Sequence, residues 1–579
     1  MLARRALGHG RAGGAGGRTP GGLSRAHFPA RLPERRPRRM SRPPHVAYFC
    51  MEFGLDPSFP IYAGGLGVLA GDFIKSAKDL AKPVVAVGLR WECGYAVQHI
   101  GPDGVPVNEF PTYDHEFLQD TGVKVRVRVR GEEVPCDVWW TDRFGHVPLY
   151  LIEPHRPEHR WITHRLYEAG TDVRIAQEML LGIGGVRALR WLGVPVAAHH
   201  FNEGHAVFAG IELIAEAMEN GLPFPDAWAA TRERIVFTTH TPVKAGNEEH
   251  TLKDLRRMGA CLELSGAEMR VLGGDPFNMT VAGLRLARAA NAVSQLHGET
   301  ARAMWAHITD AAPITAITNG VHAKTWQDPG VRAAGEDPAA LRKARAPLRR
   351  ALREEIARRG TPAPPEDALV IGFARRAAGY KRNDLVLRDP ALLTRLLAGG
   401  RVALVFAGKA HPDDAHGRAI VAAIVKVARA QPGAVSFLEN YDMALGSLLT
   451  RGSDVWLNNP VRPLEASGTS GMKAAMNGAL NLSILDGWWP EGCEPGVTGW
   501  AIGDGSSSND ERDALLTVER VERDVLPAWQ DPERWGRMMA ASVRMATGKF
   551  TSDRMVREYF ERLYTPALTE ATVGPTIPA

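Results

Sequence analysis

Short runs rich in β-branched residues, each followed by a stretch with helical apolar spacing, recur along most of this chain. The clearest runs are Pro83–Leu89, Arg234–Thr238, Leu369–Phe373, Val402–Phe406 and Asp454–Leu457. Continuous apolar runs of this kind are typical of parallel strands that are buried on both faces. Between two of them, Gly417–Ala430 spaces its apolar residues as a helix packed on a sheet requires. The alternation therefore predicts an α/β fold with right-handed crossovers.

One segment departs from this pattern. Val123–Val129 alternates valine with lysine or arginine, and Val134–Trp139 follows after a short turn. Strict alternation predicts a β-hairpin with one face exposed to water.

The chain has 579 residues, more than one hydrophobic core usually supports, so two large domains are expected. A segment rich in Arg, Ala and Pro, 327–367, is typical of a connection between them. We therefore predict two Rossmann-like domains facing across a cleft, with substrates at the carboxyl ends of their strands. The predicted parts are a tail at 1–44, a first domain at 45–326, the connection at 327–367, a second domain at 368–565 and a tail at 566–579.

The basic residues are concentrated in the first tail. Up to Pro44 the chain carries eleven arginines and one acid, Glu34, so the tail contributes about +10 to a formal net charge of +5. The body then lies near −5, which does not suit a nucleic-acid partner. The tail is expected to be disordered. An organelle leader and an upstream-extended start, with Met40 beginning the folded protein, are the two interpretations of it.

The cysteines and the apolar runs point to a cytoplasmic protein. Five widely spaced cysteines without a CxxC pair indicate neither a disulfide framework nor a zinc site, and no metal is predicted. No apolar run approaches the roughly 20 residues that span a bilayer, so no membrane association is expected.

Three segments are candidates for chemistry. The glycine-rich turn in Ile61–Phe73, which contains Gly64, Gly65 and Leu66, runs into a helix, where backbone N–H groups suit an anion. After the strand at Leu369–Phe373 come Arg376 and Lys381, a fork and a point charge suited to phosphate. The alternative for the glycine-rich turn is a tight connection without a ligand. The alternative for the segment with Arg376 and Lys381 is a solvated charged loop.

The third segment runs from Glu465 to Asp486. Small and hydroxyl residues precede a helical pattern there and can cradle a phosphate, while Lys473, if buried, has a lowered pKa and can form an imine. The residues alone leave an ordinary surface lysine as the alternative.

Glu465–Lys473, with Asn477–Leu480 and Leu485–Gly487, resembles the cofactor-lysine signature of the α-glucan (glycogen, starch and maltodextrin) phosphorylases. The resemblance covers about residues 45–560 and looks like the compact prokaryotic branch of the family. Further matching segments, in the family's order, are Ala63–Gly67, Val87–Glu92, Thr318–Val321, Arg375–Arg382 and Phe437–Tyr441.

The resemblance implies the glycosyltransferase B fold and pyridoxal 5'-phosphate as cofactor, held by Lys473 as a Schiff base. It places Arg376 and Lys381 at the substrate phosphate, together with the backbone of Gly65 in the turn Gly64–Leu66. The residues it places around the cofactor are Arg375, Ser467, Gly468, Thr469, Ser470, Tyr441 and Trp326. Those it places at the sugar are His240, Asn319, Tyr380, Glu465, Ser467 and Gly468, with Glu203 and His205 in a stretch where Glu203 replaces the family's aspartate.

The implied reaction is phosphorolysis of terminal α-1,4-glucosidic bonds by inorganic phosphate, giving α-D-glucose 1-phosphate. A sugar-nucleotide-dependent glucan glycosyltransferase and a non-catalytic glucan-binding protein of the same fold are the alternatives. The resemblance leaves open whether the chain forms a homo-oligomer.

Overall fold

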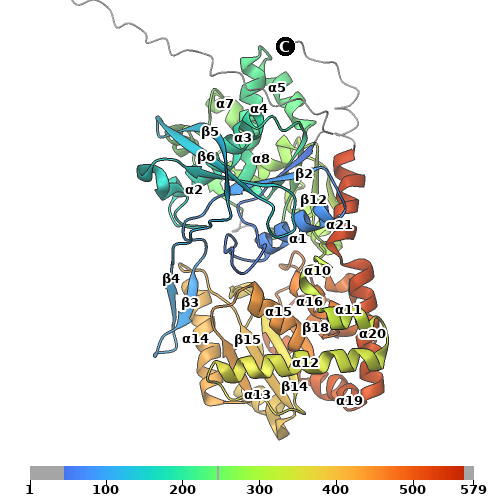
Figure 1. Cartoon of the computed structure of the whole chain (residues 1–579). Coiled ribbons are helices and arrows are strands. Elements are labelled where there is room, and N and C mark those ends of the chain that lie inside the picture. Colours follow the sequence, from blue (N-terminus) through green and yellow to red (C-terminus); the bar gives the residue numbers. More distant parts are fainter. Residues whose placement is uncertain (1–44, 244–246, 566–579) are drawn as a thin grey trace, which may run out of the picture. The chain divides into compact units, whose positions relative to one another are not determined.

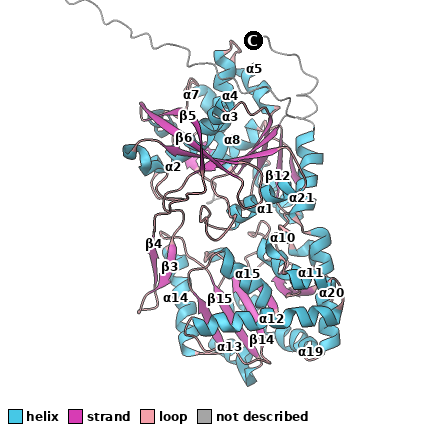
Figure 2. Cartoon of the chain, viewed as in Figure 1, coloured by secondary structure: helices cyan, strands magenta, loops and turns pink. Residues whose placement is uncertain are grey.

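The computed structural model describes residues 45–243 and 247–565. The two predicted tails, 1–44 and 566–579, lie outside the described residues, and the first strand begins at His45. Within the described part, most of the strands form two large sheets with helices packed around them (Figures 1 and 2), and β3 (Val97–Ile100) with β4 (Pro106–Glu109) and β10 (Glu249–His250) with β11 (Phe277–Asn278) form two small ones. The predicted α/β class with parallel sheets is therefore confirmed.

The first sheet has nine strands in the order β13-β12-β9-β8-β1-β2-β7-β6-β5. Its strands are β1 (His45–Phe49), β2 (Val84–Leu89), β5 (Gln119–Val129), β6 (Glu132–Thr141), β7 (Leu149–Pro154), β8 (Val196–Asn202), β9 (Ile235–Thr238), β12 (Ala289–Ala292) and β13 (Ile314–Ala316). The strands from β13 to β7 pair in parallel, and β6 and β5 add an antiparallel hairpin. The predicted hairpin is thus confirmed.

The second sheet has six parallel strands in the order β16-β15-β14-β17-β18-β19. They are β14 (Leu369–Ala374), β15 (Val402–Ala407), β16 (Val435–Leu438), β17 (Val455–Asn458), β18 (Leu480–Ile484) and β19 (Gly499–Ile502). The predicted helix appears as α14 (Ala415–Ala430), and its residues Ile420, Val421 and Ile424 lie in the core against this sheet. Counted along the chain the strand order is that of the doubly wound nucleotide-binding fold.

The segments between and after the sheets are also packed. In the predicted connection, helix α12 (Pro338–Arg358) buries Leu341 in the core of the second sheet. Helix α21 (Ser552–Tyr559), near the end of the described chain, buries Met555 and Val556 in the core of the first sheet. The chain therefore returns to the first sheet after completing the second, while the domain boundaries themselves stay a prediction. No helix within the described ranges is both long and apolar enough to cross a membrane.

A close backbone approach fixes the first glycine-rich turn. Helix α1 (Gly65–Asp79) follows this turn, and a Cβ atom on Gly71 would lie 2.0 Å from the Gly54 carbonyl oxygen. Only glycine allows helix α1 to pack this closely against the loop after β1. The approach sets the start of helix α1 next to that loop.

Candidate active site

The predicted site residues follow strands at the two points where strand order reverses. In the second sheet the strand order reverses between the neighbours β14 and β17, and β14 leads directly into Arg375 and Arg376. In the first sheet β1 and β8 are neighbours, and β8 leads into Glu203. Ligands of doubly wound sheets bind in the crevice outside such strand ends. The topology therefore supports a site at both predicted positions.

Lys473 is buried, which excludes the alternative of an ordinary surface lysine. It lies on helix α16 (Thr469–Met476) with 7% of its surface exposed, and its Nζ sits 3.6 Å from the centroid of the Trp326 ring. Burial lowers the pKa of Lys473 to about 8, against the opposing charge of Asp72. An amine with this pKa is partly neutral near pH 7 and can act as a nucleophile toward a carbonyl carbon.

Several buried donors meet at the start of helix α16. Its N-cap, Gly468, has a φ of +83°, a left-handed conformation that favours glycine, and no side chain caps the helix. A Cβ atom on Gly468 would lie 3.7 Å from Arg375 Nη2, so this arginine lies beside the helix start. Within the described part of the chain, no partner is found for Arg375 Nε and Nη1 or for Ser467 Oγ. Buried unpaired donors beside a helix N-terminus suit an anionic group such as phosphate.

Glu465 holds two of the predicted cations together. Its carboxylate accepts hydrogen bonds from Arg375 Nη2 at 2.7 Å and from Lys381 Nζ at 2.9 and 3.1 Å. Although burial opposes it, the two cations lower the pKa of Glu465 to about 2. The structure thus brings together Arg375, Lys381 and Glu465, which the sequence had placed at three different contacts.

The other predicted residues of the second sheet surround this group. The side chain of Arg376 is exposed and lies near enough to Tyr95 to lower the pKa of that phenol, against a larger rise from burial. Lys381 Nζ lies 4.7 Å from the ring centroid of Tyr380, which is half-buried. Tyr441 is half-buried; desolvation raises the pKa of its phenol to about 12, and the charge of Arg375 opposes that rise. Ser470 Oγ accepts a hydrogen bond from Trp456 Nε1 at 3.2 Å.

On the first sheet, Glu203, His240 and Asn202 form one hydrogen-bonded group. His240 Nε2 lies 2.7 Å from Asn202 Oδ1, and Glu203 Oε1 accepts from the His240 backbone N–H and from Thr241 Oγ1. Burial lowers the pKa of His240 to about 3, so its imidazole is neutral at pH 7. Glu203 has a φ of +73° and ψ of 176°, a strained conformation for a residue with a side chain. Such strain is typical of functional sites.

The glycine-rich turn is held by a residue that the sequence reasoning missed. Glu52 Oε2 accepts hydrogen bonds from the backbone N–H groups of Ala63 at 2.6 Å and Gly64 at 3.0 Å. Its other oxygen accepts from the Tyr167 hydroxyl at 2.8 Å. Gly65 then begins helix α1, and Leu66 packs partly buried on the first core. The predicted phosphate contact at the Gly65 backbone stays a prediction.

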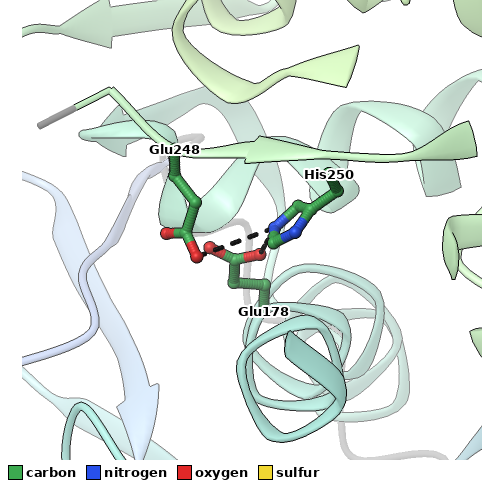
Figure 3. A group of neighbouring side chains, drawn as sticks. All are labelled: Glu178, Glu248 and His250. Atoms are coloured by element: carbon green, nitrogen blue, oxygen red, sulfur yellow. Dashed lines mark hydrogen bonds and ion pairs between the residues drawn. The ribbon is translucent and has the colours of Figure 1, made fainter. Parts of the chain in front are cut away.

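A charged cluster beside this turn was also missed. Figure 3 shows Glu178, Glu248 and His250, with His250 Nε2 at 3.0 Å from Glu178 Oε2 and 3.7 Å from Glu248 Oε1. Arg174 Nε donates to both oxygens of Glu248 at 2.9 Å, so the cluster contains its own balancing cation. The i,i+4 spacing of Arg174 and Glu178 was the one sequence signal for part of it.

A cavity of about 310 Å³ opens beside the cluster and is lined by Tyr167, Arg174, Glu248 and His250, among others. His205 lies near, with its ring centroid 5.8 Å from that of Tyr167. Burial and Arg174 lower the pKa of His205 to about 3. No partner for His205 Nδ1, or for the buried Asn319 Oδ1, is found among the residues the structure describes. Both atoms therefore have unused hydrogen-bonding capacity.

Two doubly wound α/β sheets, with a buried lysine and paired cations at one switch point, define a fold of the glycosyltransferase B type. Residues 372–491 match the sequence profile of the carbohydrate phosphorylases. The chain is 39% identical to maltodextrin phosphorylase of Thermococcus litoralis and 40% identical to glycogen phosphorylase of Mycobacterium tuberculosis, each over 91% of this chain and 71% of the relative. It is also 37% identical to an uncharacterized protein of Methanocaldococcus jannaschii, over 90% of this chain and 99% of that protein. The chain belongs to the carbohydrate phosphorylase family.

Proposed function

We propose that this chain is an α-glucan phosphorylase that cleaves the terminal α-1,4-glucosidic bond with inorganic phosphate and releases α-D-glucose 1-phosphate. The observation that carries the proposal is the buried Lys473 amine on a helix whose start is surrounded by the buried donors of Arg375 and Ser467. A lysine of lowered pKa next to an anion-fitting helix start has the donor set that pyridoxal 5'-phosphate requires.

The residues present fit this cofactor. Lys473 would hold it covalently, Trp326 and Tyr441 would line its ring, and its phosphate would lie against Arg375. The backbone and hydroxyl groups that would complete this phosphate site are those of Gly468, Thr469 and Ser470. When bound, the cofactor supplies a phosphate group that can exchange a proton with the substrate phosphate.

The remaining residues bind and orient the two substrates. Arg376, Lys381 and the Gly65 backbone would hold inorganic phosphate. Two phosphate groups in contact repel strongly, so positive charge placed between them stabilises the arrangement. In the structure Glu465 fixes Arg375 and Lys381 in one place, which prepares these cations for anions before any ligand arrives. Charges held in place need little reorganisation during the reaction.

Neutral polar groups would orient the terminal glucose. His240 remains an uncharged imidazole at pH 7 and is held by Asn202, so it can donate or accept a hydrogen bond without adding charge. Glu203 and His205 would contact the glucan from the first sheet. The residues that would complete the sugar contacts are Asn319, Tyr380, Glu465, Ser467 and Gly468. We also propose a cytoplasmic location. All five cysteines lie within the described ranges and are free thiols, as is typical of proteins in a reducing compartment.

The direct test is phosphate-dependent release of glucose 1-phosphate from a panel of glucans, with and without added pyridoxal phosphate. Borohydride reduction followed by peptide mapping should label Lys473, and the Lys473→Ala variant should lose cofactor and activity together.

Lys409 is a matched control, because burial also lowers its pKa to about 8 while its Nζ is occupied by the Ala96 carbonyl oxygen at 2.9 Å. Label on Lys409 instead, or a fully active Lys473→Ala variant, contradicts the proposal. Transfer from a sugar nucleotide without bound pyridoxal phosphate would support the glycosyltransferase alternative.

A further inference from the structure

Helix α1 carries a buried carboxylate that none of the predicted contacts includes. Asp72 is 1% exposed, and both of its oxygens lie 2.9 Å from Trp326 Nε1, which donates to them. A buried carboxylate is costly unless other groups compensate its charge. A single indole N–H compensates only part of that cost, so the surrounding charges decide what Asp72 does.

The indole that Asp72 holds is the one that covers the reactive lysine. Trp326 is 2% exposed, and its ring lies 3.6 Å from Lys473 Nζ. Its backbone carbonyl is fixed separately, by Asn477 Nδ2 at 2.9 Å and Arg451 Nε at 3.1 Å. The backbone of Trp326 is thus anchored by Asn477 and Arg451, while Asp72 on helix α1 sets the direction of the ring.

The charged groups around Asp72 also link it to Lys473. Burial raises the pKa of Asp72, and the charges of Lys473, His322 and Lys75 oppose that rise. Lys75 Nζ donates to the Leu55 carbonyl oxygen at 2.6 Å and to Thr325 Oγ1 at 3.2 Å, and His322 Nε2 lies 3.0 Å from Asp79. Both therefore have other acceptors.

Lys473 has no hydrogen-bond acceptor among the described residues. Asp72 is the negative charge with the largest effect on the pKa of its amine, which it raises, and the like charge of Lys75 lowers that pKa by less.

We propose that Asp72 is a positioning residue for Lys473. It holds the Trp326 ring over the lysine nitrogen and provides the negative charge that stabilises a cationic nitrogen there. This inference rests on the proposed function, since it concerns the nitrogen through which Lys473 would hold pyridoxal phosphate. Asp72 acts through Trp326 and through its charge, without touching either substrate.

The test compares purified holoenzymes of wild type, Asp72→Asn and Trp326→Phe. Asp72→Asn removes the charge, whereas Trp326→Phe removes the indole N–H and leaves the charge. Asp79→Asn is the matched control, because Asp79 lies on the same helix and its ion pairs are with His322 and Lys324 rather than with Trp326 or Lys473. The readouts are the pH midpoint of the absorbance change of bound pyridoxal phosphate and the dissociation constant of that cofactor.

Asp72→Asn should move the pH midpoint downward by about one unit, as expected when a close opposite charge is lost, and weaken cofactor binding about tenfold. Trp326→Phe should weaken binding with a smaller change in midpoint, and Asp79→Asn should match wild type in both. A folded Asp72→Asn variant with wild-type midpoint and affinity overturns the proposal. If that variant fails to fold, unchanged cofactor affinity in Trp326→Phe overturns it. A wild-type protein that binds no pyridoxal phosphate would instead refute the proposed cofactor.

Discussion

Replacing Glu465 with glutamine removes the one negative charge shared by two buried cations while keeping the size of the side chain. Glu465 accepts from Arg375 at 2.7 Å and from Lys381 at 2.9 Å, and the side chains of all three are nearly buried. The variant leaves both cations without a counter-charge in a site that also excludes much of the solvent. Breaking a buried ion pair in this way is strongly destabilising.

The pKa of Glu465 gives the size of the effect. Its fall from 4.5 to about 2 in the folded protein corresponds to about 3 kcal/mol of stability at neutral pH, at 1.36 kcal/mol for each pH unit. Because the pKa is lowered by folding, this stability is fully present above pH 4.5 and is lost as the pH falls toward 2. The destabilisation of Glu465→Gln relative to wild type should therefore be about 3 kcal/mol at pH 7 and smaller at pH 4.

Urea unfolding followed by tryptophan fluorescence, at both pH values and without phosphate in the buffer, measures this difference. Glu355→Gln is the matched control: the pKa of Glu355 is also lowered to about 2, by Arg358 and Arg359, but it lies on the surface of helix α12 and the Arg358 side chain is 68% exposed. Solvent screening limits such a pair to about 1 kcal/mol or less. Equal effects of the two substitutions, or a loss below about 1 kcal/mol for Glu465→Gln, would refute the reasoning.

Two further substitutions test other parts of the site. Arg376→Ala should leave the free energy of unfolding unchanged, because the side chain is exposed, but should lower kcat/KM for phosphate about 30-fold, which corresponds to about 2 kcal/mol for a charged contact; an unchanged phosphate dependence would remove Arg376 from the site. His200 is buried between Tyr564 and Thr238 with its pKa lowered to about 3, so its contribution to stability is present above pH 6.5 and is lost as the pH falls toward 3. His200→Gln should therefore show a weaker fall in the free energy of unfolding between pH 6.5 and 4 than wild type, and an equal fall would contradict this account.

The fold could be predicted from the sequence because its main signals are local. Val402–Phe406 is apolar throughout since both faces of β15 are covered, and the alternation at Val123–Val129 marks a strand with one wet face. Each signal lies within the few residues that form the element. The return of helix α21 to the first sheet could not be predicted in this way, because it depends on contacts between residues far apart in the sequence. Asn291 and Tyr559 are 268 positions apart, and Ser76 and Ser552 are 476 positions apart.

The residues of the candidate site also differ in whether a local sequence signal predicts them. Lys473, Arg375 and Lys381 could be proposed because each lies in a short segment with its own signal. The carboxylates that organise them could not be assigned these roles, since neither Glu52 nor Asp72 has a distinctive sequence context. Glu52 meets Ala63 and Tyr167 only after β1 and the turn have folded. Residue types that serve as partners carry no local pattern, so only the folded structure shows them.

These carboxylates have a common role in the site. Glu52 accepts from the amides of the glycine-rich turn, Glu465 from Arg375 and Lys381, and Asp72 from Trp326 beside Lys473. Leaving all of these buried donors without a hydrogen-bond partner would lower the stability of the folded protein. Each carboxylate satisfies part of a donor set and fixes its geometry, while Arg375 Nε and Nη1 keep capacity for a further anion. The same residues that stabilise the protein therefore fix the positions of its cations and of its buried lysine.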